Sequence, residues 1–223
     1  MPAKKRETKE QKKKRAAKIV KALKRRYPNA TTALHFTSPY ELLVATVLAA
    51  QCTDKKVNEV TVKLFRKYRS PEEFARARLS SLERMIKPTG FFRNKSKSLK
   101  ALSKEIVERH CGKVPEKLED LVELTGVGRK TANVVRAGAF DKPGIIVDTH
   151  MIRLAGRLGL TGEKDPAKLE FALMDLLPRR VWGDFSFMIV LHGRETCKAR
   201  RPLCHICPVE EHCPSAPGYS RTA

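Results

Sequence analysis

Residues 124–130 read LTGVGRK, a Gly-x-Gly turn followed directly by two basic residues. If residues 116–124 form one helix and residues 129–139 another, the second with Ala132, Val135 and Ala139 at helical spacing, the unit is a helix, a tight hairpin and a second helix. Glycines let the backbone turn sharply, and the free N–H groups that open the second helix can bind an anion such as a phosphate. The motif by itself is also compatible with a purely structural turn.

The rest of the chain has the same helical spacing and no sustained strand alternation, which predicts an all-α protein. Residues 42–50 are apolar on almost every side, so we expect a buried central helix there. Ser70-Pro71 and Asp165-Pro166 each place a capping residue before a proline, a combination typical of helix starts. Pro143-Gly144 is the expected crossing between two helical lobes.

The composition favours a polyanionic partner. The 223 residues include 46 Lys+Arg against 24 Asp+Glu, a net charge of +22. Nucleic acid is the first candidate, because each neutralised phosphate releases counterions, and an anionic membrane surface is the second. Neither a membrane span nor an apolar signal-peptide core is expected. Residues 1–15 are rich in lysine and arginine and predict a disordered basic arm, either an inert tail or a non-specific DNA tether.

Two residues near the hairpin are candidates for chemistry. Lys130 lies in the first turn of the second predicted helix, where the positive end of the helix dipole disfavours an ammonium group. A free amine there could attack a sugar C1′ and form a Schiff base, or Lys130 could simply pair with a phosphate. Asp148 precedes a promising helix start, so it could be an N-cap, and a capped carboxylate could also stabilise positive charge or assist proton transfer. His150 could cap, bind phosphate or fill space.

Four of the six cysteines, Cys197, Cys204, Cys207 and Cys213, have the spacing C-x6-C-x2-C-x5-C. In a reducing compartment such a cluster indicates metal ligation, and thiolate chemistry alone allows either zinc or an iron-sulfur centre. Between the first two cysteines lie Lys198, Arg200 and Arg201, a candidate phosphate clamp. Cys52 and Cys111 are expected to be ordinary buried or half-buried thiols.

Taken together, the chain resembles bacterial endonuclease III, of the helix-hairpin-helix DNA glycosylase superfamily, over roughly residues 30–214. The matched segments are residues 48–54, 89–95, 124–135, 147–150, His192-Gly193 and the four clustered cysteines. The resemblance implies a two-lobed all-α fold, with a six-helix lobe that contains the hairpin at 32–143 and a cluster lobe from 16–31 plus 144–214. The basic arm at 1–15 and a tail at 215–223 complete the expected division. The resemblance also implies a 4Fe-4S cluster on the four cysteines.

The resemblance further implies a bifunctional DNA glycosylase and AP lyase that removes oxidised pyrimidines such as thymine glycol and nicks abasic sites. Lys130 matches the Schiff-base lysine, and Asp148 matches the essential aspartate. Gln51 matches a residue that fills the gap left by the extruded base, and Phe91 lies where the family often has a leucine wedge. Gly126, Gly128, Arg129, His150 and the three loop cations are the other expected DNA contacts.

The partner implied is double-stranded DNA with a damaged base or an abasic site, bound by a monomer in a bacterial cytoplasm, where DNA binding associates it with the nucleoid. A monofunctional mismatch or adenine glycosylase is one alternative, but the family resemblance would then predict no lysine at position 130. A non-catalytic DNA-binding protein with a four-cysteine zinc site is another, and it leaves the joint presence of Lys130, Asp148 and Gln51 unexplained. Phe91 and Phe92 could also be core residues.

Overall fold

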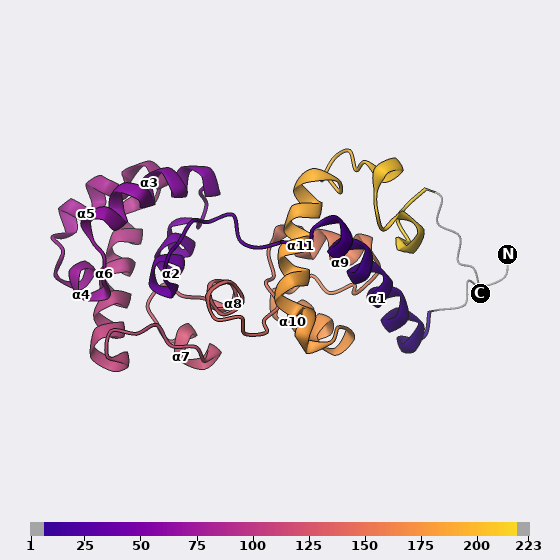
Figure 1. Ribbon diagram of the computed structural model, residues 1–223, viewed down its shortest axis with the longest axis horizontal. Coiled ribbons are helices and arrows are strands. Elements are labelled where there is room, and N and C mark those ends of the chain that lie inside the picture. The colour runs from indigo at the N-terminus through magenta and orange to yellow at the C-terminus, as the bar shows by residue number, and fades with distance from the viewer. Residues whose placement is uncertain (1–6, 218–223) are drawn as a thin grey trace. The chain divides into compact units, whose positions relative to one another are not determined.

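The computed structural model describes residues 7–217, and within this range every regular element is a helix. The α-helices are α1 (Lys9–Arg26), α2 (Pro39–Leu48), α3 (Asp54–Lys67), α4 (Pro71–Arg76), α5 (Leu79–Ile86), α6 (Phe92–His110), α7 (Leu118–Val122), α8 (Arg129–Ala139), α9 (Thr149–Arg157), α10 (Pro166–Leu176) and α11 (Trp182–Glu195). Short 3-10 helices are η1 (Lys87–Thr89), η2 (Arg179–Val181), η3 (Cys204–Ile206) and η4 (Glu210–His212). The prediction of an all-α fold is confirmed (Figure 1).

The chain divides into two compact units. One is the continuous segment Thr32–Lys142, which contains α2 to α8. The other combines the described parts of Met1–Thr31 and Pro143–Ala223, so α1 belongs with α9, α10 and α11 although more than a hundred residues separate them. The boundary falls immediately before Pro143-Gly144.

In the continuous unit, α2 is the central helix. Every residue of α2 from Leu42 to Leu48 is buried, and α2 packs against α3, α6 and α8. Its start matches the sequence signals: the Ser38 hydroxyl accepts the amide of Glu41, and Pro39 occupies the first turn. A capping side chain followed by proline also begins α4, at Ser70-Pro71, and α10, at Asp165-Pro166, which confirms both predicted helix starts.

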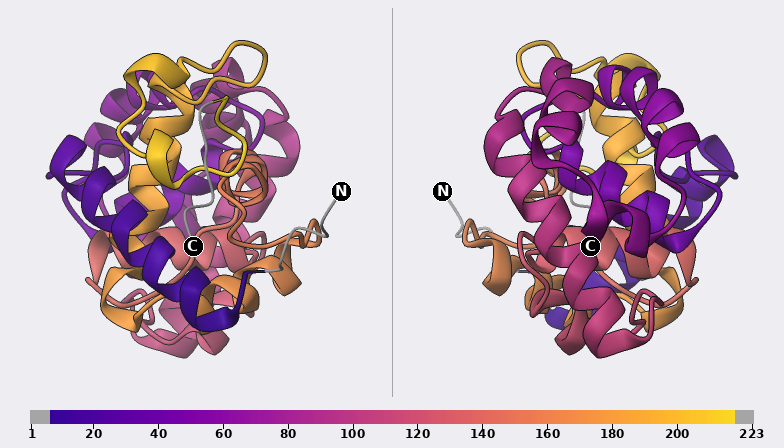
Figure 2. Two further views of the ribbon diagram at one scale, coloured as in Figure 1. Left: turned by 90° about the vertical axis from the view of Figure 1, so that its right-hand side faces the viewer. Right: turned by 90° about the vertical axis from the view of Figure 1, so that its left-hand side faces the viewer.

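In the discontinuous unit, α1 supplies one wall of the core. Ile19 and Leu23 are fully buried and belong to one apolar cluster with Leu154 of α9 and Ile189 of α11. The left view of Figure 2 shows α1 beside the C-terminal loop, and α1 contacts η4. The N-terminal helix is therefore part of the same core that supports the cysteine loop.

The prediction of a disordered arm over residues 1–15 is wrong for residues 9–15, which form the first turns of α1. Thr8 and Gln11 make a reciprocal capping box, and Arg15 is only 8% exposed. Its guanidinium pairs with Glu7 and donates to the carbonyls of Leu158, Gly159 and His212. These partners are distant in sequence, so the basic composition alone did not reveal them. Residues 1–6 lie outside the described range.

Two other boundaries differ from the sequence prediction. The helix expected at residues 116–124 is limited to Leu118–Val122, because Lys117 is extended and Leu124 already begins the hairpin. The tail predicted from residue 215 starts later: Ala216 is buried and its amide donates to the Cys213 carbonyl. Residues 218–223 lie outside the described part of the chain.

Candidate DNA-processing site and iron-sulfur loop

The hairpin between α7 and α8 is built so that its two glycines serve different purposes. Gly126 has φ +80°, and a Cβ there would lie 3.0 Å from the Cβ of Ser98. Gly128 has the ordinary φ of −90°, and a Cβ there would meet nothing within 4 Å. The first glycine is therefore required by the protein's own backbone, whereas the second leaves open space in front of the N-terminus of α8.

The hairpin is hydrogen-bonded to α6, and the residues that follow its turn are exposed to solvent. The Thr125 amide and hydroxyl both donate to the carboxylate of Glu105 on α6, at 2.8 and 2.5 Å. Val127 is buried, whereas Gly128, Arg129 and Lys130 are exposed. No side chain caps α8, so its first amides face outward together with two cationic side chains. This arrangement suits a phosphate.

Alanine substitutions should separate the two glycines. Gly126→Ala should destabilise the protein by about 1–3 kcal/mol, because alanine at φ +80° is strained and presses on Ser98. Gly128→Ala should leave the free energy of unfolding nearly unchanged but weaken binding to duplex DNA several-fold. Chemical denaturation and DNA titration of both variants measure this. Equal stability losses in the two variants would contradict the assignment.

Asp148 is the N-cap of α9, as one reading of the sequence predicted. Its Oδ1 accepts the Met151 amide at 2.7 Å, and Oδ2 has no hydrogen-bond partner within the described residues. The preceding segment is fixed because the Ile146 amide donates to the Ser186 hydroxyl at 2.9 Å. The carboxylate is therefore held in one orientation and keeps one oxygen available.

His150 lies where α9 and α11 come close together, next to Gly193 of α11. Its Nδ1 lies 3.2 Å from Nη2 of Arg153, and a Cβ on Gly193 would lie 2.4 Å from that nitrogen. Glycine in the His192-Gly193 pair is thus explained by the lack of room for any side chain. Arg153 also donates to the carbonyls of Gly193 and Cys197, which brings His150 and the first cluster cysteine into one local network.

Gln51 and Phe91 share an unusual backbone state. Both have positive φ, +53° and +47°, and both are exposed, Phe91 by 62%. Phe91 is therefore not a core residue; it is the N-cap of α6, and Phe92 is half-buried. Cys52 is half-buried as predicted, but Cys111 is exposed, because it ends α6 in the left-handed conformation at the surface.

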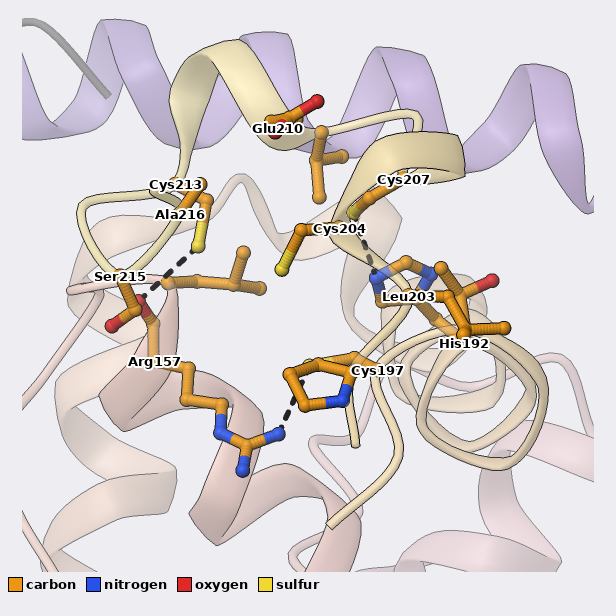
Figure 3. Close-up of a pocket in the computed structure, with 14 residues that line it drawn as sticks. Arg157, His192, Cys197, Leu203, Cys204, Cys207, Glu210, Cys213, Ser215 and Ala216 are labelled. Atoms are coloured by element: carbon orange, nitrogen blue, oxygen red, sulfur yellow. Dashed lines mark hydrogen bonds between the residues drawn. The ribbon is translucent and has the colours of Figure 1, made fainter. Parts of the chain in front are cut away.

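The four clustered cysteines line one cavity of about 110 Å³ in the discontinuous unit. Figure 3 shows their side chains around a common space, with the sulfur atoms of Cys204 and Cys213 pointing into it. A single zinc ion needs its sulfurs within about 2.3 Å of one point. Four cysteine side chains around one cavity are a donor set that suits an iron-sulfur cluster as well as a four-thiolate zinc ion.

Surrounding groups support this cavity. His192 contributes Nε2 at 3.6 Å from the Cys207 sulfur, and Arg157 donates to the Cys197 sulfur at 3.4 Å. Burial raises the pKa of the Cys207 thiol to about 11 and also raises that of Cys213. Metal centres bind thiolates, so these thiols must lose their protons when they act as ligands.

Beyond the first cysteine, the loop presents its cations to solvent. Arg157 of α9 donates to the carbonyls of Lys198 and Ala199, at 2.8 and 2.6 Å, so the backbone of the loop is fastened to α9. The side chains of Lys198, Arg200 and Arg201 are exposed. The fixed backbone and free cations form a surface to which an anion can bind.

Sequence reasoning did not single out Arg15, Arg153 and Arg157, which tie the loop to α1, α9 and α11 through backbone carbonyls. No motif marks an arginine whose partners are carbonyls far along the chain.

Within residues 7–217 no helix is long and apolar enough to span a membrane.

The chain matches two family models. Residues 44–179 match the HhH-GPD superfamily base excision DNA repair protein, and residues 197–213 match the iron-sulfur binding domain of endonuclease III. Those 17 residues begin and end at the first and last clustered cysteines. The protein carries a 4Fe-4S cluster, and the four cysteines that line the cavity are a donor set that suits it.

Two similar proteins and one solved structure agree with these models. The endonuclease III of Synechocystis is 48% identical over 92% of this chain and 94% of that protein, and that of Bacillus subtilis is 44% identical over 84% and 86%. A trapped endonuclease III–DNA covalent intermediate superposes with a TM-score of 0.86 at 38% identity, covering 91% and 96% of the two chains. The chain therefore belongs to the endonuclease III family of base excision repair DNA glycosylases with AP lyase activity.

Proposed function

We propose that this DNA-binding enzyme removes oxidised, ring-saturated or fragmented pyrimidines such as thymine glycol from double-stranded DNA and then nicks the abasic site. The observation that carries the proposal is Lys130, an exposed amine in the first turn of α8 directly after an outward-facing hairpin. Family membership supplies the reaction class, and Lys130 supplies the nucleophile that a bifunctional member needs.

The chemistry assigned to Lys130 has two stages. The unprotonated Nζ attacks C1′ of the damaged nucleotide, the C1′–N bond breaks and the base leaves with the bonding electrons and a proton. The sugar then opens: the C1′–O4′ bond breaks, O4′ takes up a proton from solvent, and the nitrogen lone pair forms the C1′=N bond of a Schiff base that keeps its remaining N–H proton. A proton is then lost from C2′, the 3′ phosphate leaves by β-elimination, and water hydrolyses the Schiff base to release the enzyme.

Asp148 is assigned to electrostatic stabilisation. Its carboxylate is fixed by the Met151 amide, so it need not reorganise when positive charge develops on the sugar. A carboxylate in this state can also assist proton transfer. Capping and catalysis are compatible because the two oxygens are used separately.

The other predicted residues are assigned to binding and extrusion. Gly126, Gly128 and Arg129 present the α8 N-terminus to a phosphate, and His150, Lys198, Arg200 and Arg201 contact the backbone from the discontinuous unit. Base removal requires flipping the nucleotide out of the duplex. Gln51 fills the gap, and the exposed ring of Phe91 stacks into the opened helix.

Cys197, Cys204, Cys207 and Cys213 are the proposed ligands of the cluster. When bound, the cluster fixes the loop that displays the cations, and neither hydrolysis nor β-elimination calls for electron transfer. We further propose that the enzyme acts as a monomer in a bacterial cytoplasm, associated with the nucleoid through its DNA binding.

The proposal is tested with the native protein on duplexes that carry one thymine glycol, one A·G mismatch or no lesion. Thymine glycol should be released and the strand nicked at that site, with an unsaturated aldehyde on the 3′ end, while the other duplexes stay intact. Adenine release from the mismatch would indicate the monofunctional alternative. Tight binding to every duplex without base release would assign the chain to a non-catalytic role.

A further inference from the structure

Lys95 is a buried lysine whose charge joins two separate segments of the continuous unit. The residue is 6% exposed and lies on the first turn of α6. Its Nζ donates to the carbonyl of Leu48 at 2.9 Å and to the carbonyl of Thr89 at 2.8 Å. These two acceptors are 41 positions apart in the sequence, so no local pattern relates them.

Each acceptor belongs to the last residue of the helix that precedes one of the two proposed wedge residues, Gln51 and Phe91. Leu48 is the last residue of α2, three positions before Gln51, and Thr89 is the last residue of η1, two positions before Phe91. Left-handed conformations are costly for residues other than glycine, so they persist only where the surrounding structure enforces them. We call residues 49–53 and 90–91 the two wedge segments.

Burying an ammonium group in a protein core costs free energy because the charge loses its hydration. Desolvation lowers the pKa of Lys95, which shows that burial penalises its charged form. An apolar side chain would fill the same space without that penalty. What the ammonium group of Lys95 contributes is its N–H donors, which hold the carbonyls of Leu48 and Thr89 close to one nitrogen.

We propose that Lys95 is a positioning residue that sets the spacing of the two wedge segments, so that Gln51 and Phe91 can enter an opened duplex together. The inference rests on the proposed roles of Gln51 and Phe91. Lys95 touches neither DNA nor the reacting atoms; it acts through the backbone that carries the wedge residues.

Lys100 provides a matched control on the same helix. Its Nζ also donates to two carbonyls, those of Ala75 and Ala77, at 2.8 and 2.7 Å. Those carbonyls belong to the end of α4 and the link after it, and no left-handed residue follows them closely. Lys95→Met and Lys100→Met each remove two hydrogen bonds to backbone carbonyls, but only Lys95→Met should change DNA recognition.

The measurement is the ratio of affinities for a duplex with a tetrahydrofuran abasic analogue and for the undamaged duplex, with 2-aminopurine opposite the analogue to report insertion. Lys95→Met should lower the ratio about tenfold, equivalent to about 1.4 kcal/mol, and reduce the fluorescence change. Lys100→Met should keep both within about twofold. An unchanged ratio in Lys95→Met would overturn the inference.

Further variants separate this inference from the proposed function. Gln51→Ala and Phe91→Ala should each lower the same ratio; if they do not, the wedge assignment itself fails. Combining Lys95→Met with Phe91→Ala should lower the ratio by less than the product of the single effects, because both act through one contact with DNA. Full additivity would refute action through Phe91. If Lys95→Met does not fold, Lys95→Gln, which keeps one donor, is judged by the same ratio.

Discussion

Replacing Lys130 with glutamine should abolish the covalent adduct that borohydride traps on a thymine glycol duplex, and strand nicking should fall by at least about a thousandfold. Glutamine has no amine, so it cannot form the Schiff base that borohydride reduces. The side chain is exposed at the start of α8, so the variant should fold and unfold like the parent, within about 0.5 kcal/mol.

Arg129→Gln is the neighbouring control, because it removes a cation from the same turn without removing the amine. It should weaken DNA binding but still give the trapped adduct at saturating enzyme. The experiment is read by gel mobility of the reduced complex and by product sizing. An adduct that persists in Lys130→Gln would place the nucleophile on another residue.

Asp148→Asn should separate capping from catalysis. Asparagine caps helices about as well as aspartate, so Oδ1 can still accept the Met151 amide and stability should change little. The negative charge is lost, and single-turnover base release should slow by about a hundredfold or more. Asp148→Ala should lose the same activity and about 1 kcal/mol of stability.

Asp165 is the matched control for this prediction, because it caps α10 in the same way, accepting the Lys168 amide at 2.9 Å. Asp165→Ala should cost about 1 kcal/mol of stability and leave base release unchanged. Stability is followed by chemical denaturation and activity by quenched-flow assay at saturating enzyme. Normal activity in Asp148→Asn would reduce Asp148 to a capping residue.

The parts of the fold predicted from sequence are those fixed by local interactions. The span Arg129–Ala139 was predicted to the residue, because the hairpin glycines end one helix and open the next. The starts at Pro71 and Pro166 followed from a capping side chain and a proline, which act within four residues. The spacing of the cysteines likewise identified one loop, and the cavity that all four cysteines line is completed by residues of α9 and α11.

Other features depend on contacts that are distant in sequence. Residues 9–15 have the composition of a solvent-exposed basic segment, but Arg15 donates hydrogen bonds to the carbonyls of Leu158 and His212. Nothing around Lys95 reveals that its charge is buried between two carbonyls. The exposure of Phe91 depends on a left-handed backbone state, whereas sequence alone leaves an aromatic pair open to a core reading.

The division of the chain also orders its synthesis. Residues 32–142 are continuous, so this unit can fold as soon as it leaves the ribosome. The apolar face of α1 is made before that unit but finds its partners on α9, α10 and α11 only after the segment that follows residue 142 has emerged. During that interval Ile19 and Leu23 have no core to enter, and the proposed cluster ligands, Cys197, Cys204, Cys207 and Cys213, are translated after the whole continuous unit. A newborn chain therefore carries a finished hairpin before it can bind iron, and α1 is the segment that a chaperone would have to shield.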